Sequence, residues 1–342
     1  MPLGCRRFAT ALSVMGVSAF VVPLAPGGPR PGGSTRSRCA AAAPTAAAPE
    51  GVKNWRDLSS AAPEIASGRF YRTGCLSYAT VGTEPRLVDT ANLRTIVDLR
   101  SAYERSEAKD PQVNNDDIYG GYPLAAEMKA GLTGRAPLDI EAGGDKRRYF
   151  IAFLDEKLYT WAMFWGLKKR SKIKMLTQAL AAPSKRIRTK LKLRMSRAIN
   201  DGGLGLLNDI ILRYSGAQLC STLKLAATPE RHPVAMYCTA GKDRTGIIVM
   251  LTLAALGVDD EAIVADYVKS DNAYRDLNDK KAMVGALEQH NLDPDLFLVA
   301  PEYVARGVLE AVNEEYGGIE AYLDSIGFDA AWRLKLRDAM LA

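Results

Sequence analysis

Residues 234–257 read VAMYCTAGKDRTGIIVMLTLAALG. The first four residues are apolar or aromatic and predict a short buried strand. The run from Thr245 to Leu256 is apolar over more than three turns and predicts a buried helix that Gly257 ends. A short polar loop that starts at Cys238 joins the two elements. A strand, a tight loop and a helix in this order are typical of an α/β protein.

The loop combines a thiol with features that bind phosphate. Because Gly241 lies midway between Cys238 and Arg244, the loop can curl so that successive main-chain N–H groups form an anion-binding nest. The following helix adds the positive end of its dipole, and the Arg244 guanidinium is a planar fork for two phosphate oxygens. The positive electrostatic field of the helix end and of Arg244 favours the thiolate form of Cys238. The loop therefore predicts nucleophilic attack on phosphorus and a phosphocysteine intermediate. The alternative, a buried cysteine beside a helix-capping arginine, explains the spacing but not the whole string.

No metal or other cofactor is expected. The predicted mechanism needs none, and two histidines, His232 and His290, exclude a histidine metal cluster. Three of the five cysteines follow residue 49, which gives no even-numbered disulfide framework. A reducing compartment and at least one reactive thiol fit this number.

Other parts of the chain predict further strands and helices. Strands are expected over 70–72 and 95–99, where apolar and β-branched residues cluster. Helices are expected over 146–197, with a break near Pro183, over 203–226, and from Gly257 to the C-terminus. Strands and helices alternate only in part, so the predicted class is α/β with an excess of helix.

The string CTAGKDRTG at residues 238–246 resembles the signature loop of the atypical tyrosine/serine phosphatase family, the protein tyrosine phosphatase B-like group. The resemblance covers residues 51–342 apart from a long insertion. It implies one phosphatase domain, with a cysteine-phosphatase-like central sheet flanked by helices, a helical lid insertion at 129–200 and a helical C-terminal part. Further blocks resemble the same family: NWRDL (54–58), GRFYRTG (68–74), IVDLRS (96–101) with Glu104, ADY (265–267), and the stretch from YGG (316–318) to Tyr322-Leu323.

The resemblance implies that Cys238 is the nucleophile and Arg244 the phosphate ligand. Phosphotyrosine or phosphoserine proteins are the implied substrates. The run Ala240-Gly241-Lys242 also resembles the loop of phosphoinositide phosphatases, so inositol lipids are an alternative. Tyr237 stands where the family usually has histidine, and it supplies no cation beside the thiol. The other loop residues are expected to bind the substrate phosphate: Thr239, Ala240, Gly241, Lys242, Thr245 and Gly246.

The general acid must protonate the leaving oxygen. Asp243 lies within the loop, at the position that the resemblance assigns to the family's characteristic acid. Asp98, which leaves a predicted strand toward the same end of the sheet, is the second candidate, and its alternative is capping or pairing with Arg100. Asp201 lies upstream of the loop, but the glycines after it favour a helix cap.

Two other classes of function remain open. A phosphate-binding pseudophosphatase or interaction module would use the same loop without turnover, and an assay with an aryl phosphate separates it from an enzyme. A sulfur-transfer enzyme of the rhodanese type also has a cysteine loop that ends in arginine. The KDRTG run at 242–246 and the flanking blocks argue against that class.

The net charge of +6 is unevenly distributed. Residues 146–197 contain sixteen Lys and Arg against two acidic residues, which leaves 29 basic and 37 acidic residues elsewhere. Aromatic residues are interspersed in this basic segment. It predicts either a lid over the active site with a solvated basic face, or a lid that docks on an anionic membrane surface or a polyphosphorylated ligand. Nucleic acid is not expected as a partner, because no binding module is recognisable around the segment.

Residues 1–49 contain no Asp or Glu, and they combine five arginines with an apolar stretch over 8–22. The apolar stretch is too short and interrupted for a membrane span. Small residues at 17–19 and the Arg-, Pro- and Ser-bearing stretch that follows predict a cleavable targeting leader. This composition resembles the bipartite leaders of complex algal plastids, so import into a plastid (chloroplast) is expected, with the mitochondrion as the alternative.

Overall fold

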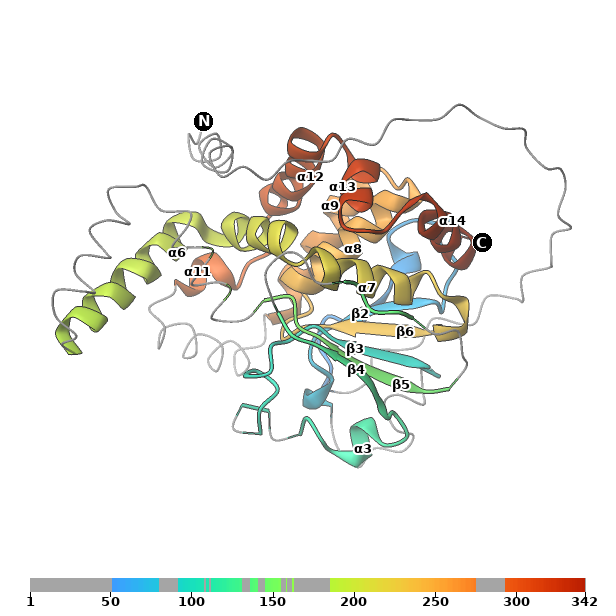
Figure 1. The fold of residues 1–342 in the computed structure, drawn as a ribbon, viewed down its shortest axis with the longest axis horizontal. Coiled ribbons are helices and arrows are strands. Elements are labelled where there is room, and N and C mark those ends of the chain that lie inside the picture. Colours follow the sequence, from blue (N-terminus) through green and yellow to red (C-terminus); the bar gives the residue numbers. More distant parts are fainter. Residues whose placement is uncertain are drawn as a thin grey trace, which may run out of the picture.

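A six-stranded sheet is the centre of the molecule (Figure 1). The computed structural model describes residues 51–79, 92–107, 109–110, 112–130, 136–140, 145–154, 158, 162, 185–274 and 293–341. The strand order is β1-β2-β6-β3-β5-β4, and all neighbours are parallel except β1 and β2. The strands are β1 (Arg56–Asp57), β2 (Phe70–Thr73), β3 (Thr95–Asp98), β4 (Leu124–Met128), β5 (Arg147–Ile151) and β6 (Val234–Tyr237).

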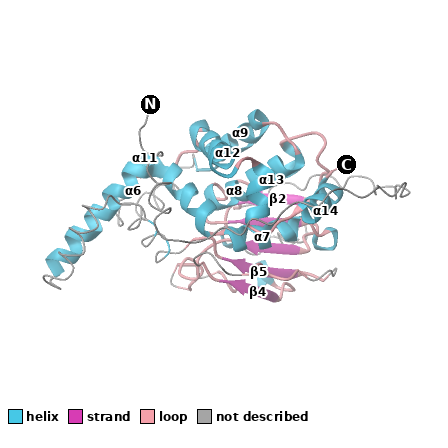
Figure 2. Cartoon of the chain, turned by 45° about the horizontal axis from the view of Figure 1, so that its top comes forward, coloured by secondary structure: helices cyan, strands magenta, loops and turns pink. Residues whose placement is uncertain are grey.

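Most described helices lie against one face of this sheet (Figures 1 and 2). The short helix α3 (Asp116–Tyr119) lies on the other side. Short 3-10 turns complete the chain at Leu58–Ser60, Leu76–Tyr78, Pro229–Arg231 and Lys269–Tyr274. The remaining helices are α6 (Lys185–Tyr214), α7 (Gly216–Ala226), α8 (Asp243–Leu256), α9 (Asp260–Val268), α11 (Pro294–Phe297), α12 (Glu302–Tyr316), α13 (Ile319–Ser325) and α14 (Ala330–Met340).

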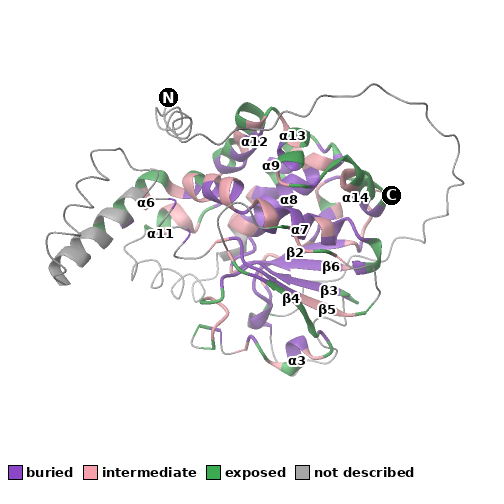
Figure 3. Ribbon diagram, in the orientation of Figure 1, coloured by how far each residue is buried: buried purple, intermediate pink, exposed green. Residues whose placement is uncertain are grey.

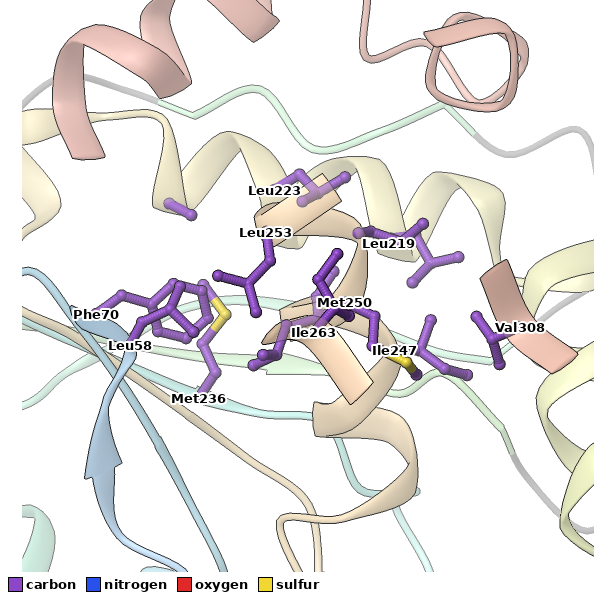
Figure 4. Close-up of a cluster of buried hydrophobic side chains, with 14 of the residues drawn as sticks. Leu58, Phe70, Leu219, Leu223, Met236, Ile247, Met250, Leu253, Ile263 and Val308 are labelled. Carbon is purple, nitrogen blue, oxygen red and sulfur yellow. The ribbon is translucent and has the colours of Figure 1, made fainter. Parts of the chain in front are cut away.

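Two apolar clusters cover the two faces of the sheet. Because side chains alternate along a strand, Met236 and Cys238 join the larger cluster under the helices, whereas Ala235 and Tyr237 join the smaller cluster beside α3. Helix α8 lies across the larger cluster and is buried over most of its length (Figures 3 and 4). This burial holds the β6–loop–α8 unit at the centre of the fold.

The predicted strands at 70–72, 95–99 and 234–237 are confirmed as β2, β3 and β6. The predicted helix at 245–256 is confirmed as α8, which begins two residues earlier. It ends at Gly257, whose φ of 86° is the left-handed conformation that glycine tolerates best.

The helix expected from residue 146 is wrong at its start, because residues 147–151 form strand β5. This strand pairs with β3 on one side and β4 on the other, and its last three residues are buried. The Arg148 guanidinium lies 4.7 Å from the centre of the Tyr119 ring, so the basic residue also packs. Pairing with two neighbouring strands overrides the local composition here.

The helix expected over 203–226 is divided in the structure. Helix α6 ends at Tyr214 and α7 starts at Gly216, and the intervening Ser215 hydroxyl donates a hydrogen bond to the Phe153 carbonyl. Helix α6 also has non-helical backbone at Gly203, two residues after the exposed Asp201.

Two regions for which the sequence predicts a function, the leader and the basic segment, lie largely outside the described residues. The leader at 1–49 lies wholly outside the described residues, so the leader and import into a plastid stay predictions. Of the basic segment 146–197, residues 155–184 lie outside them except Leu158 and Ala162, and membrane docking also stays a prediction. No helix in the described ranges is both long and apolar enough to cross a membrane.

Candidate active site

Residues 238–242 form the loop that joins β6 to α8, at the edge of the sheet where parallel strands β2, β3 and β6 all end. Cys238 begins the loop and has 2% of its surface exposed. Cys75, Cys220 and Cys238 are all free and buried. The loop therefore places one buried thiol at the positive end of a 14-residue helix.

The carbonyl groups of the loop are turned away from its interior and toward the scaffold. The Thr239 carbonyl accepts a hydrogen bond from the Cys75 N–H at 3.1 Å. The Asn54 side-chain amide donates to the Ala240 and Gly241 carbonyls at 3.1 and 2.9 Å. The Lys242 carbonyl accepts from the Gly246 N–H within the first turn of α8.

The main-chain N–H groups from Ala240 to Thr245 are the donors of the loop and of the first turn of α8. Among the described residues, no group accepts a hydrogen bond from the main-chain N–H groups of residues 240–245. The first N–H groups of any helix lack intrahelical partners. Here the loop before α8 adds further N–H groups that have no acceptor among the described residues. Consecutive unbound donors at a helix N-terminus are what an anion-binding nest requires.

Gly241 gives the loop its shape. Its φ of 65° lies in the left-handed region, and a Cβ atom there would lie 2.3 Å from the Thr73 carbonyl oxygen. A larger residue would therefore force the loop away from β2. Gly241 acts through backbone geometry, and it has no side chain to contribute.

Arg244, on the first turn of α8, forms a two-pronged ion pair with Glu104. Its Nη1 and Nη2 atoms donate to the two carboxylate oxygens, each at 2.7 Å. The Thr239 hydroxyl donates to Glu104 at 2.8 Å, so the carboxylate also fixes the loop. The Nε–H of Arg244 has no acceptor among the described residues. Glu104 thus binds the Nη1–Nη2 edge of the guanidinium, and the Nε–H edge has no partner among the described residues.

This pairing shifts the pKa values of both side chains. Burial would raise the pKa of Glu104, but the Arg244 charge and the hydrogen bonds from Arg244, Ser101 and Thr239 outweigh it and hold this pKa well below its usual range. Burial would lower the pKa of Arg244, and the Glu104 carboxylate raises it instead. Both groups are charged at neutral pH.

Glu104 was not among the site residues predicted from the sequence. A local signal for it exists, because Ser101 and Glu104 have the Ser-x-x-Glu spacing of a capping box. The structure shows that geometry: the Ser101 N–H donates to the Glu104 carboxylate at 2.9 Å, and the Glu104 N–H donates to the Ser101 hydroxyl at 3.3 Å.

Lys242 was expected to bind substrate phosphate, but its side chain lies elsewhere. It is 2% exposed, and its ammonium donates to the Phe297 and Val299 carbonyls at 2.6 and 2.7 Å. It also lies 3.6 Å from the Asp243 carboxylate. The Lys242 ammonium therefore links the loop to the end of α11 and the residues after it. The hydrogen bonds of this ammonium go to those carbonyl groups.

Asp98 lies on the wrong face of the sheet for its predicted role as an acid. It is next to Tyr237 in the register of β3 and β6, whereas Cys238 faces the opposite way. The Asp98 carboxylate is fully buried and pairs with Arg100 through three side-chain hydrogen bonds of 2.7–3.1 Å. The structure therefore favours the alternative of an ion pair with Arg100.

Asp243 and Thr245 are both on the first turn of α8. The Asp243 Oδ1 atom and the Thr245 hydroxyl are buried and have no hydrogen-bond partner in the described structure. Gly246, another predicted phosphate-binding residue, is buried against the Tyr267 ring. The structure thus brings Cys238, Asp243 and Arg244 together around one loop, with Thr245 beside them.

A second arginine, Arg72 of β2, supports the loop from behind. Its Nη2 donates to the Gly241 carbonyl at 2.8 Å, and its Nη1 donates to Asp266 of α9 at 2.5 Å. Arg56 also donates to Asp266, at 2.8 Å. Burial would raise the pKa of Asp266, but Arg72 and Arg56 outweigh it and lower this pKa to about 2. Sequence spacing alone did not predict this contact, because 194 positions separate Arg72 from Asp266.

Tyr237, which directly precedes Cys238, belongs to a buried polar network beside α3. Its hydroxyl lies 3.1 Å from the Tyr119 hydroxyl, which lies 3.1 Å from the Ser77 hydroxyl. Ser77 donates to Asp110 at 2.6 Å. Burial, and then the charge of Asp98, raise the pKa of Tyr237 well above its usual value. Tyr237 therefore anchors the end of β6 as a neutral hydroxyl.

Comparison of the sequence with known proteins finds phosphatases. A family model described as "Tyrosine phosphatase family" matches residues 48–342. The sequence is 30% identical over 167 residues to a protein named "Triple specificity protein phosphatase PtpB" from Mycobacterium tuberculosis, over 43% of this chain and 58% of that protein. It is 36% identical over 122 residues to a protein named "Tyrosine-protein phosphatase" from Nostoc commune, over 34% of this chain and 42% of that protein. The alignments thus span about half the length of these relatives.

Proposed function

Because this chain belongs to the tyrosine phosphatase family, we propose that it hydrolyses phosphate monoesters with Cys238 as the nucleophile. The observation that carries this proposal is the row of N–H groups at 240–245, which have no acceptor among the described residues and lie two residues after a buried thiol. A phosphate dianion supplies the acceptors that these donors lack. Arg244 adds its open Nε–H edge to the same anion.

The reaction proceeds in two displacements. The Cys238 thiolate attacks phosphorus, an S–P bond forms, and the P–O bond to the leaving group breaks as Asp243 protonates the leaving oxygen. Water then attacks the phosphocysteine, Asp243 takes a proton from it, and the S–P bond breaks to release inorganic phosphate. The loop N–H groups and Arg244 stabilise the charge that develops on the phosphoryl oxygens in both steps.

For the substrate, we propose a phosphorylated protein carrying phosphotyrosine or phosphoserine. Phosphoinositides are the alternative. Recognition of several phosphates on one headgroup needs cations beyond Arg244, and Lys242 is bound to two main-chain carbonyls. That observation favours a single phosphate monoester. A phosphate-release panel over phosphotyrosine peptides, phosphoserine peptides and phosphoinositide vesicles decides between them. Faster turnover of the vesicles than of every peptide would overturn this choice.

The variant Cys238→Ser tests the nucleophile. We expect turnover of 4-nitrophenyl phosphate to fall to background, because a serine hydroxyl at this position has no base to activate it. Inorganic phosphate should still raise the melting temperature of the variant, since the N–H groups and Arg244 remain.

A matched control is Cys220→Ser, which changes another free, buried cysteine, located on α7. It should keep wild-type turnover. Turnover that survives in Cys238→Ser would contradict the mechanism. A wild-type protein that binds phosphate without any turnover would indicate a pseudophosphatase.

A further inference from the structure

Tyr267 of α9 packs its ring onto the first turn of α8. A Cβ atom at Gly246 would lie 3.2 Å from both Cδ2 and Cε2 of this ring, which is tighter than ordinary packing contacts. Glycine at 246 therefore leaves the space that the ring occupies. Tyr267 itself is fully buried, so this contact places its hydroxyl inside the protein beside the candidate active site.

The Tyr267 hydroxyl has no hydrogen-bond partner among the described residues. Leaving a buried hydroxyl unpaired destabilises a protein, so such groups are few and each needs an explanation. Two other buried oxygens without partners belong to Asp243 and Thr245, on the turn of α8 that contains Gly246. Three of the buried side-chain atoms that lack a partner among the described residues thus belong to residues on or packed against one turn of helix.

The charges around the Tyr267 hydroxyl keep it protonated. Burial, and next the negative charge of Asp243, raise the pKa of Tyr267 far above its usual value, and Tyr303 and Cys238 act in the same direction. Arg72 acts in the opposite direction and is outweighed. Asp243 also faces Lys242 at 3.6 Å and interacts with the charge of Arg244. The hydroxyl is therefore a hydrogen-bond donor that interacts electrostatically with a carboxylate whose buried Oδ1 atom has an ion pair with Lys242 but no hydrogen bond among the described residues.

We propose that Tyr267 is a positioning residue for Asp243, and that its hydroxyl donates a hydrogen bond to the carboxylate as the acid gives up its proton. The inference rests on the proposed role of Asp243. Tyr267 keeps its own proton throughout, and the proton of Asp243 goes to the leaving oxygen. The contact is open in this structure, and hydrogen bonds of this kind often tighten only in the substrate complex.

The variant Tyr267→Phe removes the hydroxyl and keeps the ring on Gly246. We expect kcat for phenyl phosphate, which has a poor leaving group, to fall about tenfold, because the variant loses a hydrogen bond to a charged group. For 4-nitrophenyl phosphate, whose leaving group needs little protonation, kcat should change less than twofold.

A double-mutant cycle shows whether Tyr267 acts through Asp243. Adding Tyr267→Phe to Asp243→Asn should produce no further loss with phenyl phosphate, because the group that it positions is already disabled. Additive losses would overturn the inference. An unchanged ratio between the two substrates in the single variant Tyr267→Phe would overturn it as well.

The melting temperature of Tyr267→Phe shows whether the Tyr267 hydroxyl positions Asp243 or only stabilises the fold. Removing an unpaired hydroxyl should leave the melting temperature of Tyr267→Phe unchanged or higher. The matched control Tyr322→Phe removes another buried hydroxyl, one that donates to the Leu212 carbonyl at 2.9 Å. It should lower the melting temperature and leave the substrate ratio unchanged. A Tyr267→Phe variant that is clearly destabilised or unfolded would show that the hydroxyl is structural.

The cycle also separates this inference from the proposed function. If Cys238→Ser is inactive and Asp243→Asn affects phenyl phosphate most, the proposed function holds whatever Tyr267→Phe does. If Asp243→Asn reduces turnover of both substrates equally, Asp243 is not the acid, and the inference fails with that role.

Discussion

Two arginine–carboxylate pairs flank the loop at residues 238–242, and they differ in burial. Arg244 and Glu104 lie on the open side, with 16% and 32% of their side chains exposed. Arg72 and Asp266 lie behind the loop, with 0% and 1% exposed. In the proposed function the exposed pair gains a phosphate as a third partner, whereas the buried pair is closed to solvent. The same type of ion pair would then serve ligand binding on one side of the loop and support of the backbone on the other.

The largest effect on stability is expected for Arg72→Met. Removing one partner of a buried pair leaves an uncompensated charge, which typically costs about 3–5 kcal/mol. Because Arg56 still contacts Asp266, the low end of this range is expected. Urea unfolding measures the loss. The control Arg306→Met breaks an exposed pair with Glu261 and should produce no measurable change. Equal stability of the two variants would show that burial does not distinguish these pairs.

Arg244→Lys should affect turnover and spare stability. An ammonium cannot bridge two phosphate oxygens or hold both oxygens of Glu104, so kcat should fall about 10²- to 10³-fold, as when one transition-state donor is removed. The urea midpoint should stay near that of the wild type. Steady-state kinetics and unfolding on the same preparation test both statements. A variant that keeps normal kcat would exclude bidentate phosphate binding by this residue.

Glu104→Gln should have the smallest effect, about a tenfold fall in kcat. The amide keeps the size of the side chain but loses the charge that orients the guanidinium. KM should stay the same or fall, because Arg244 then attracts the phosphate dianion without competition. The matched control is Glu127→Gln, which weakens the ion pair of Arg105 with Glu127 and should leave kcat unchanged. A rise in KM without a fall in kcat would show that Glu104 serves binding only.

Local sequence patterns predicted the part of the site that lies within one short stretch. The strand at 234–237, the loop that follows and helix α8 are all recognisable from their residues, because burial periodicity and the helix-ending Gly257 act over a few positions. The capping-box spacing of Ser101 and Glu104 is of the same local kind. That signal does not reveal that Glu104 also binds an arginine 140 positions away.

Long-range contacts place several residues in ways that the sequence alone did not reveal. Residues 147–151 are rich in arginine, yet they form a central strand because β3 and β4 pair with them on both sides. Asp98 is the last residue of β3, which ends at the same edge of the sheet as β6, but the alternation of side chains turns it to the face opposite Cys238. Lys242 lies within the signature loop, and main-chain carbonyls from residues 297 and 299 hold it.

The sequence by itself determined which residues form the loop, that a thiol and a guanidinium lie six positions apart in it, and that a helix follows. Only the tertiary structure decided which way each polar side chain of the loop points. The physical reason is that buried polar groups must find partners, and in this fold the partners of Arg244 and Arg72 are 140 and 194 positions away along the chain. Those contacts exist only after the sheet and α9 have assembled around the loop.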